Sequence, residues 1–190
     1  GAGTQAKPDA DAGDDAFLIA RFRRGDGRAF DELVRRYRRP IYYLALRYVK
    51  DEHEAEDLAQ RAFVRAFEKI ADFRGDASFR TWIYRITVNL SLNHLRDHAR
   101  TTPQPIAEAA IAVEPRDGAV EAESQRRLRA ALEQLPPKQR LVMELRVFEE
   151  LSFRDVAAIA ECSEDAAKAN FHHALKRLRT LMTDHEGPHS

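Results

Sequence analysis

The chain has 190 residues, 44% apolar and 33% charged, and its 31 basic and 31 acidic residues cancel to a formal net charge of zero. This composition is typical of a soluble folded protein with one or two small cores, and it excludes a collagenous or wholly disordered chain. The single cysteine excludes an internal disulfide and a multi-cysteine metal site, and no apolar run is long enough for a transmembrane helix.

Residues 1–16 are small and acidic rather than basic and then apolar, so they lack the pattern of a secretory signal peptide. We therefore expect a cytoplasmic protein with no direct membrane insertion. Charge alternates along the chain: residues 21–40 carry eight basic against three acidic side chains, and residues 41–60 carry two against five. The alternation indicates separate cationic and anionic partner surfaces, although ordinary solvated helix faces would also produce it.

The first half of the chain is predicted to form four helices, because its apolar residues recur at helical spacing. A tail at 1–14 precedes a helix at about 15–24 that ends at Gly25, and the second helix, over 28–49, contains Pro40, which predicts a kink or a break. The third spans 53–70, and after a polar loop at 71–77 Ser78 is a good N-cap for the fourth, over 78–98. The residues predicted to face the core are Phe30, Leu33, Val34, Tyr37, Ile41, Leu44, Ala45 and Tyr48, then Leu58, Ala59, Ala62, Phe63, Ala66, Phe67 and Ile70, then Phe79, Trp82, Ile83, Ile86 and Leu90.

Residues 99–119 contain three prolines and no apolar period, which predicts a flexible linker before a second domain at 120–184 and a tail at 185–190. Helices are predicted in that domain at about 120–134, 138–149, 152–160 and 163–182. Pro136 and Pro137 separate the first two, because proline suits a first helical turn. Ser152 and Asp155 form a capping box. The predicted fold class is all-α, with two small helical domains joined by the linker.

The last two predicted helices have the spacing of a helix-turn-helix, in which the second helix enters the major groove of DNA. Lysines on its outer face suit phosphate or guanine, and its acidic residues suit the amino group of cytosine. The same acids also stabilise a helix start, so a helical hairpin with a solvated face remains an alternative. The candidate contacts to duplex DNA are Ser163, Glu164, Asp165, Lys168, His172 and Lys176.

The predicted helix at 78–98 and the loop before it form a second candidate nucleic-acid surface. Polar side chains follow one face of this helix at steps of four, four and three residues. Arginines and aromatic rings beside a loop suit unstacked bases of a single strand, although Phe79 and Trp82 are equally explained as core. The candidate residues are Arg74, Arg80, Tyr84, Arg85, Asn89, Asn93 and Arg96.

The run DEHEAED at 51–57 places pairs of carboxylates one helical turn apart. Such acids stabilise a helix N-terminus, which is the simplest explanation of the run. The functional alternative is a surface that binds a basic partner.

The span from about 15 to 182 resembles the bacterial extracytoplasmic-function (ECF) sigma factors, a two-domain class that gives RNA polymerase its promoter choice. The first domain is similar through FDELVRRY, EAEDLAQRAFVRAFEKI and FRTWIYRITVNLSLNHLR, and the second through LPPKQRLVMELRVFEELSFRDVAAIAECS. The second stretch alone resembles many helix-turn-helix regulators. Both stretches in this order, joined by a linker, are specific to the family.

The resemblance implies a sigma factor with three surfaces and no catalysis of its own. The surface that docks on the clamp helices of core RNA polymerase would be Glu54, Glu56, Asp57 and Gln60. The 71–78 loop and the face from Arg85 to Arg96 would open the promoter and read its −10 element, and the 163–176 helix would read the −35 element. The linker would thread toward the active-site cleft of the polymerase, and an anti-sigma factor is implied as a further partner.

Four residues depart from the usual pattern of the family. Glu161 stands where the helix-turn-helix turn usually has glycine, Ala166 and Asn170 where threonine and arginine are common, and Asn93 where an aspartate is usual. These departures concern the promoter sequence that is read, and they leave the expected fold and docking surface unchanged.

Other classes of function are weaker alternatives. His94 and His98 are four residues apart and could share a metal ion, but the sequence around them suggests no third ligand, so no metal, cofactor or small-molecule substrate is expected. No catalytic motif is present, and Cys162 is interpreted as a half-buried apolar residue rather than a redox sensor. A sigma mimic that only binds an anti-sigma factor, and a simple helix-turn-helix repressor, are the remaining alternatives.

Overall fold

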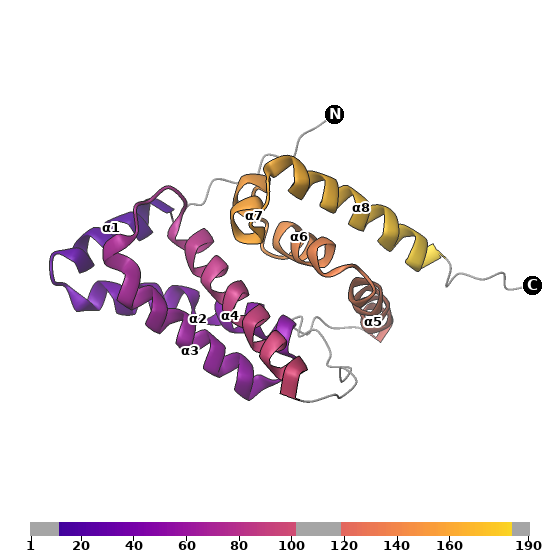
Figure 1. Ribbon diagram of the computed structural model, residues 1–190, viewed down its shortest axis with the longest axis horizontal. Helices are drawn as coiled ribbons and strands as arrows, with labels where there is room; N and C mark the ends of the chain where they lie inside the picture. Colours follow the sequence, from indigo (N-terminus) through magenta and orange to yellow (C-terminus); the bar gives the residue numbers. More distant parts are fainter. Residues whose placement is uncertain (1–11, 102–118, 184–190) are drawn as a thin grey trace, which may run out of the picture. The chain divides into compact units, whose positions relative to one another are not determined.

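The computed structural model describes residues 12–101 and 119–183 (Figure 1). These residues form helices joined by short turns, without a β-strand, and the predicted all-α fold is confirmed. The helices divide into two compact units, with α1–α4 in the first and α5–α8 in the second. No helix in these two ranges combines the length and apolar character needed to cross a membrane.

The first unit contains α1 (Ala12–Arg23), α2 (Gly27–Val49), α3 (Glu52–Lys69), a 3-10 turn η1 (Ile70–Asp72) and α4 (Phe79–Thr101). Three helices are capped at their N-termini by side chains that accept hydrogen bonds from backbone N–H groups. Asp26 accepts from Arg28 at 3.1 Å, Asp51 from Glu54 at 2.9 Å, and Ser78 from Thr81 at 3.1 Å. Gly25 takes a left-handed φ of +96° between α1 and α2, a conformation that glycine adopts without steric cost.

The core of the first unit lies between α2, α3 and α4, which contact one another, while α1 packs mainly on α2 (Figure 1). Leu33, Ile41, Leu44, Leu58 and Ile83 are fully buried there. Full burial of such a side chain contributes roughly 1.5–3 kcal/mol relative to leaving it in water. α3 contributes the small residues Ala55, Ala59, Ala62 and Ala66 to this core.

Two boundaries and one break differ from the sequence predictions. Ala12, Gly13 and Asp14, assigned above to a tail, belong to α1, and α4 continues past residue 98 to Thr101. The rest of the predicted linker and most of both tails lie outside the described residues. α2 runs through Pro40 without interruption, because buried Tyr37 and Ile41 on either side hold the two segments against the same core.

The second unit contains α5 (Ala119–Glu133), α6 (Pro137–Val147), α7 (Phe153–Ala160) and α8 (Glu164–Thr183). α8 packs across the other three, and the core is formed by Leu132, Val142, Leu145, Ile159 and Ala174. Pro137 occupies the first turn of α6 as predicted. The predicted caps are also present, since Ser152 accepts from Asp155 N and Ser163 from Ala166 N, each at 3.1 Å.

Candidate functional site

The acidic surface of α3 is presented by a helix whose opposite side is buried. Ala55, Leu58 and Ala62 anchor α3 in the core, which leaves Glu56, Asp57 and Gln60 exposed and Glu54 half-buried. Asp57 lies 3.5 Å from Arg61 one turn later. Burial, followed by the neighbouring carboxylates of Glu52 and Glu56, raises the pKa of Tyr42 on α2. The predicted docking residues therefore share one helix and lie among further carboxylates at its start.

Apolar side chains extend this acidic surface along α3. Val64 and Phe67 are 57% and 53% exposed and continue from Gln60 at helical spacing. The prediction that Phe67 faces the core was wrong. Its ring lies instead at the edge of the unit, with centroids 5.4 Å from Phe22 and 5.2 Å from Phe30. Sequence periodicity could not separate an edge position from a core position here, because Phe63 and Ala66 beside it are buried.

The predicted polar face of α4 is present. Arg85, Asn93 and Arg96 are exposed and Asn89 is half-buried. Arg96 donates a hydrogen bond to the side-chain oxygen of Asn93, so these two residues act as one polar group. Arg74 is exposed in the preceding loop, where Gly75 takes a left-handed φ of +77°.

Tyr84 was predicted to lie on this surface with the other nucleic-acid contacts, but the structure buries it. Its side chain is only 1% exposed, and the Arg80 guanidinium carbon lies 5.5 Å from the centre of its ring. The physical reason is that α4 packs against α1, α2 and α3, so more than one stripe of the helix is buried. A buried polar side chain on such a stripe can form its hydrogen bond within the helix. The Thr87 hydroxyl, for example, donates to the carbonyl of Ile83 at 2.8 Å.

An aromatic cluster lies where the 73–78 loop joins α4. The Trp82 ring centroid is 5.1 Å from that of Phe73 and 5.9 Å from that of Phe79. Phe79 is buried, whereas Trp82 and Phe73 are half-buried. The predicted core position of Trp82 is therefore only partly correct, and one side of this cluster is accessible beside the exposed loop.

The outer face of α8 carries the remaining predicted residues. Ser163, Glu164, Asp165, His172 and Lys176 are exposed, and Lys168 is half-exposed. The Lys168 ammonium lies 2.8 Å from the Glu164 carboxylate, and this hydrogen bond raises the pKa of Lys168.

Asn170 donates to the carbonyl of Ala166 at 2.9 Å, which folds its amide back onto α8. The turn before α8 is closed by Glu161 at a left-handed φ of +52°. Glutamate therefore holds a conformation that usually favours glycine.

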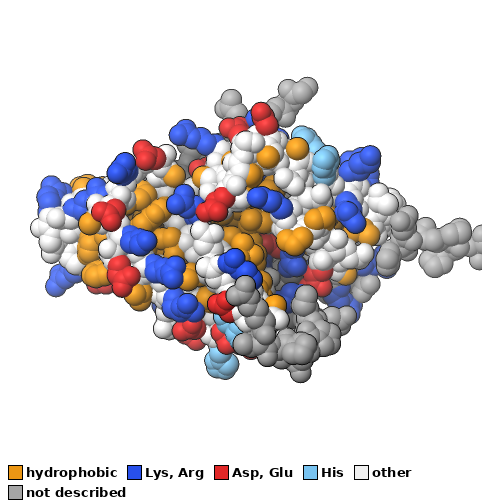
Figure 2. Space-filling view, viewed as in Figure 1, with side chains coloured by type: hydrophobic (Ala, Val, Ile, Leu, Met, Phe, Trp, Pro, Cys, Tyr) orange, Lys and Arg blue, Asp and Glu red, His pale blue; other side chains and the backbone are white. Residues whose placement is uncertain are grey.

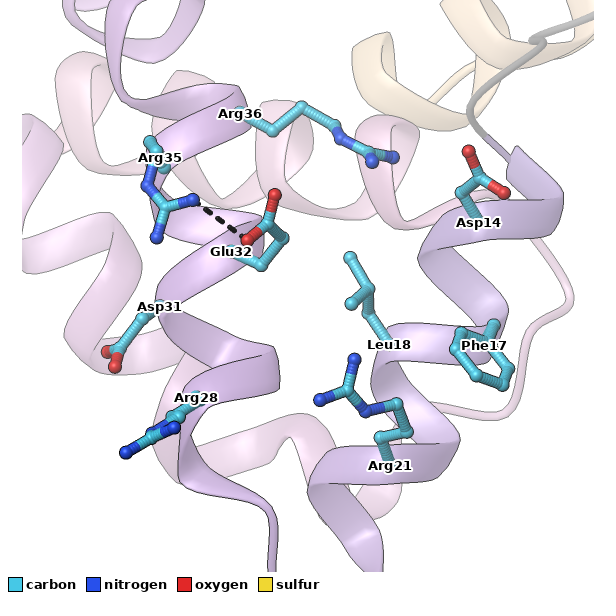
Figure 3. Close-up of a pocket in the computed structure, with 9 residues that line it drawn as sticks. All are labelled: Asp14, Phe17, Leu18, Arg21, Arg28, Asp31, Glu32, Arg35 and Arg36. Atoms are coloured by element: carbon cyan, nitrogen blue, oxygen red, sulfur yellow. Dashed lines mark hydrogen bonds and ion pairs between the residues drawn. The ribbon is translucent and has the colours of Figure 1, made fainter.

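A shallow hollow between α1 and α2 is lined mainly by charged residues (Figure 3). Leu18 and Arg36 project into it (Figure 3). Arg35 pairs with Glu32 at 2.8 Å, and Arg36 pairs with buried Asp15 at 2.7 Å. The nine lining residues include no serine, cysteine or histidine that could act as a nucleophile or base. The pair between Arg36 on α2 and Asp15 on α1 joins the two helices, whereas Arg35 and Glu32 both lie on α2.

Comparison with known proteins gives a consistent result for both units. Residues 33–101 match the sigma-70 region 2 family, and residues 125–178 match the sigma-70 region 4 family. The chain is 37% identical to the RNA polymerase sigma-H factor of Pseudomonas aeruginosa over 86% of its own length and 91% of that protein. It is 31% identical to the ECF RNA polymerase sigma factor SigW of Bacillus subtilis, over 87% of this chain and 95% of the relative. It belongs to the ECF sigma factor family.

Solved structures agree with this sigma factor fold. The structure of CnrH in complex with the cytosolic domain of CnrY matches with a TM-score of 0.67 and 26% identity, over 90% of this chain and 97% of that one. The sigma factor RpoE of Bartonella quintana, solved in complex with the anti-sigma factor NepR, has the same fold at 22% identity and a TM-score of 0.67. The ECF sigma factor described here is thus a transcription regulator that binds core RNA polymerase and promoter DNA, as predicted from its sequence.

Proposed function

We propose that this sigma factor divides promoter recognition among three helices, with α3 docking on the clamp helices of core polymerase, α4 reading the −10 element and α8 reading the −35 element. It acts in the cytoplasm, where the polymerase and promoter are found, and performs no catalytic step of its own. The observation that carries the proposal is that the polar residues expected on each of these helices are exposed or half-exposed, with the exception of buried Tyr84.

Docking through α3 is supported by the mixed character of its exposed surface. Glu56, Asp57 and Gln60 offer charge and hydrogen bonds, and Val64 with Phe67 offers apolar area beside them. Protein interfaces commonly combine an apolar centre with a charged rim that steers the encounter. The exposed apolar residues would be covered in the complex.

Reading of single-stranded DNA by α4 is supported by the accessible aromatic cluster at its start. Trp82 and Phe73 are half-buried, so their rings retain accessible surface beside the exposed Arg74. An unstacked base requires such a stacking surface together with positive charge for the backbone. Arg85 and the Asn93–Arg96 pair extend the polar surface along the helix.

Duplex recognition by α8 is supported by its place as the second helix of a helix-turn-helix. The first helix, α7, has 8 residues and α8 has 20. Lys168, His172 and Lys176 provide donors for phosphates and base edges. The side-chain amide of Asn170 donates to the carbonyl of Ala166 on its own helix, so we assign it no DNA contact.

We infer that an anti-sigma factor is a further partner, and that it covers surfaces used by polymerase. Exposed apolar residues on α3 and α4 support this inference, because Val64, Phe67, Leu92 and Leu95 are 57%, 53%, 40% and 39% exposed. A partner that covers them would compete with core polymerase by simple occlusion.

The decisive experiment reverses the charge of the docking surface. Glu56→Lys combined with Asp57→Lys should weaken binding to purified core polymerase at least tenfold and lower run-off transcription in parallel, because like charges across an interface repel. The far-ultraviolet circular dichroism of the variant should match that of the parent, since both side chains are exposed.

The matched control is Asp31→Lys combined with Glu133→Lys, which makes the same change in net charge at exposed positions on α2 and α5. Equal affinities of the two double variants for core polymerase would contradict docking through α3. A parent chain that neither binds core polymerase nor yields a transcript from any promoter would favour the sigma mimic instead.

A further inference from the structure

Two histidines and a glutamate from different helices meet beside the docking surface. Glu54 lies in the first turn of α3, and His94 and His98 lie one turn apart near the end of α4. The three potential ligand atoms are all within 4.8 Å of one another, the one such group found among the described residues. The sequence suggested no third ligand for the histidine pair, because Glu54 is 40 residues away and is brought near only by the packing of α3 on α4.

The distances within this cluster are close to those of a site with three ligands. Nε2 of His94 is 3.5 Å from a carboxylate oxygen of Glu54, and the two imidazole rings are 4.1 Å apart, centroid to centroid. Ligands about 2.1 Å from a tetrahedral Zn²⁺ ion lie roughly 3.4 Å from one another. The side chains therefore need to move by about 1 Å to close around an ion.

The surroundings allow that movement while keeping the site defined. The His94 side chain is 14% exposed and is held between the two helices, whereas Glu54 is 43% exposed. His98 is exposed at the outer edge of the cluster. The first turn of α3 is fixed by the cap between Asp51 and the backbone N–H of Glu54.

The donor set selects the class of ion. Imidazole nitrogens suit Zn²⁺, Cu²⁺, Ni²⁺ and Co²⁺, whereas Mg²⁺ and Ca²⁺ prefer oxygen ligands alone. Two histidines and one carboxylate leave a fourth position open for water or a further ligand. We propose that Glu54, His94 and His98 form a site for a divalent transition-metal ion, and that its occupation removes Glu54 from the surface that docks on core polymerase. The second part rests on the docking role proposed above, and the first part does not.

The metal site is tested on the full chain without polymerase. Titration with Zn²⁺ in a calorimeter should show one ion per chain bound with micromolar or tighter affinity. Co²⁺ bound at the same site should give the visible absorption of a four-coordinate ion. His94→Ala and His98→Ala should each weaken this binding at least tenfold. His53→Ala, an exposed histidine next to Glu54, is the matched control and should leave it unchanged.

Absence of micromolar binding would overturn the site, as would binding that survives in the combined His94→Ala and His98→Ala variant. The cluster would then be an ion pair between Glu54 and His94 only. Circular dichroism of each variant verifies that a lost signal does not reflect unfolding.

The effect on docking is tested separately with core polymerase. Saturating Zn²⁺ should weaken binding of the parent chain severalfold and leave His98→Ala unaffected, which controls for any action of the ion on the polymerase. Zn²⁺ binding by the parent without any change in polymerase affinity would overturn the coupling and the role of Glu54 in docking, while the metal site would stand. Loss of Zn²⁺ binding would leave the docking proposal untouched.

Discussion

Asp15 is a buried charge on which the packing of α1 depends. It is 1% exposed, accepts a hydrogen bond from Arg36 at 2.7 Å and another from the Tyr37 hydroxyl, and so ties α1 to α2. A buried carboxylate is tolerated only when its oxygens are paired in this way. The sequence gives no sign of this role, because Asp14 beside it is an equally acidic residue of the same helical turn.

We predict that Asp15→Asn destabilises the first unit by about 2–3 kcal/mol, since hydrogen bonds to a charged group contribute about 1.5–3 kcal/mol each and the amide can replace them only in part. Urea unfolding followed by fluorescence of Trp82, the single tryptophan, reports this unit directly. Asp14→Asn removes the same charge from the same turn at an exposed position. Similar unfolding midpoints for the two variants would show that Asp15 acts only through the helix dipole.

Lys168 is the residue for which the DNA-binding proposal makes a quantitative prediction. Lys168→Ala should lower promoter affinity of the holoenzyme and reduce the slope of log affinity against log salt by about one unit, if the ammonium neutralises one phosphate. Its ion pair with Glu164 is solvent-exposed, so little free energy is lost when a phosphate replaces the glutamate as its partner. Arg177→Ala, about two and a half turns further along α8, is the control. An unchanged slope for Lys168→Ala would show that this lysine contacts solvent rather than a phosphate.

At the scale of helices, the features that depend on residues nearby in the sequence were predicted correctly. The caps at Ser78, Ser152 and Ser163 are present because each is decided within one helical turn. Tyr84 and Phe67 were placed wrongly because their exposure depends on how many helices surround α4 and on where α3 reaches the edge. The third ligand of the histidine pair was missed for the same reason, since tertiary packing alone brings Glu54 to it.

The turn between α7 and α8 offers a test of backbone strain. Glu161 has φ +52° and ψ +53° at the C-cap of α7, and a side chain in this region costs about 1–2 kcal/mol that glycine avoids. Glu161→Gly should therefore stabilise the second unit by about 0.5–1 kcal/mol after the entropy of glycine is counted.

Thermal unfolding followed by circular dichroism should show this gain, while the Trp82 transition of the first unit stays unchanged. Glu161→Ala is the matched control, because it removes the same charge but keeps the Cβ atom. An equal gain in both variants would assign the effect to charge rather than to backbone strain.

At the scale of the whole molecule, basic and acidic residues balance, and neither sign of charge dominates the sequence. Figure 2 shows Lys and Arg side chains interspersed with Asp and Glu over the visible face, and the full sequence has no net charge. Nonspecific DNA binding derives mostly from positive charge, so the free chain is expected to bind DNA weakly. Attachment of both units to core polymerase would then supply, through effective concentration, the affinity that each lacks alone.

If core polymerase holds both units, the length of the segment at 102–118 should have little effect on promoter affinity. Doubling it with glycine and serine adds a loop-closure cost of about 0.6 kcal/mol, so promoter affinity of the holoenzyme should fall by no more than about threefold. With purified core polymerase, a promoter-binding assay measures the affinity and run-off transcription measures initiation.

Replacing the segment by glycine and serine at its original length is the control, because it changes the composition of the segment without changing its length. A large loss on lengthening alone would mean that the segment sets a fixed spacing between the units, whereas a loss of transcription in the control would mean that its own side chains act inside the polymerase.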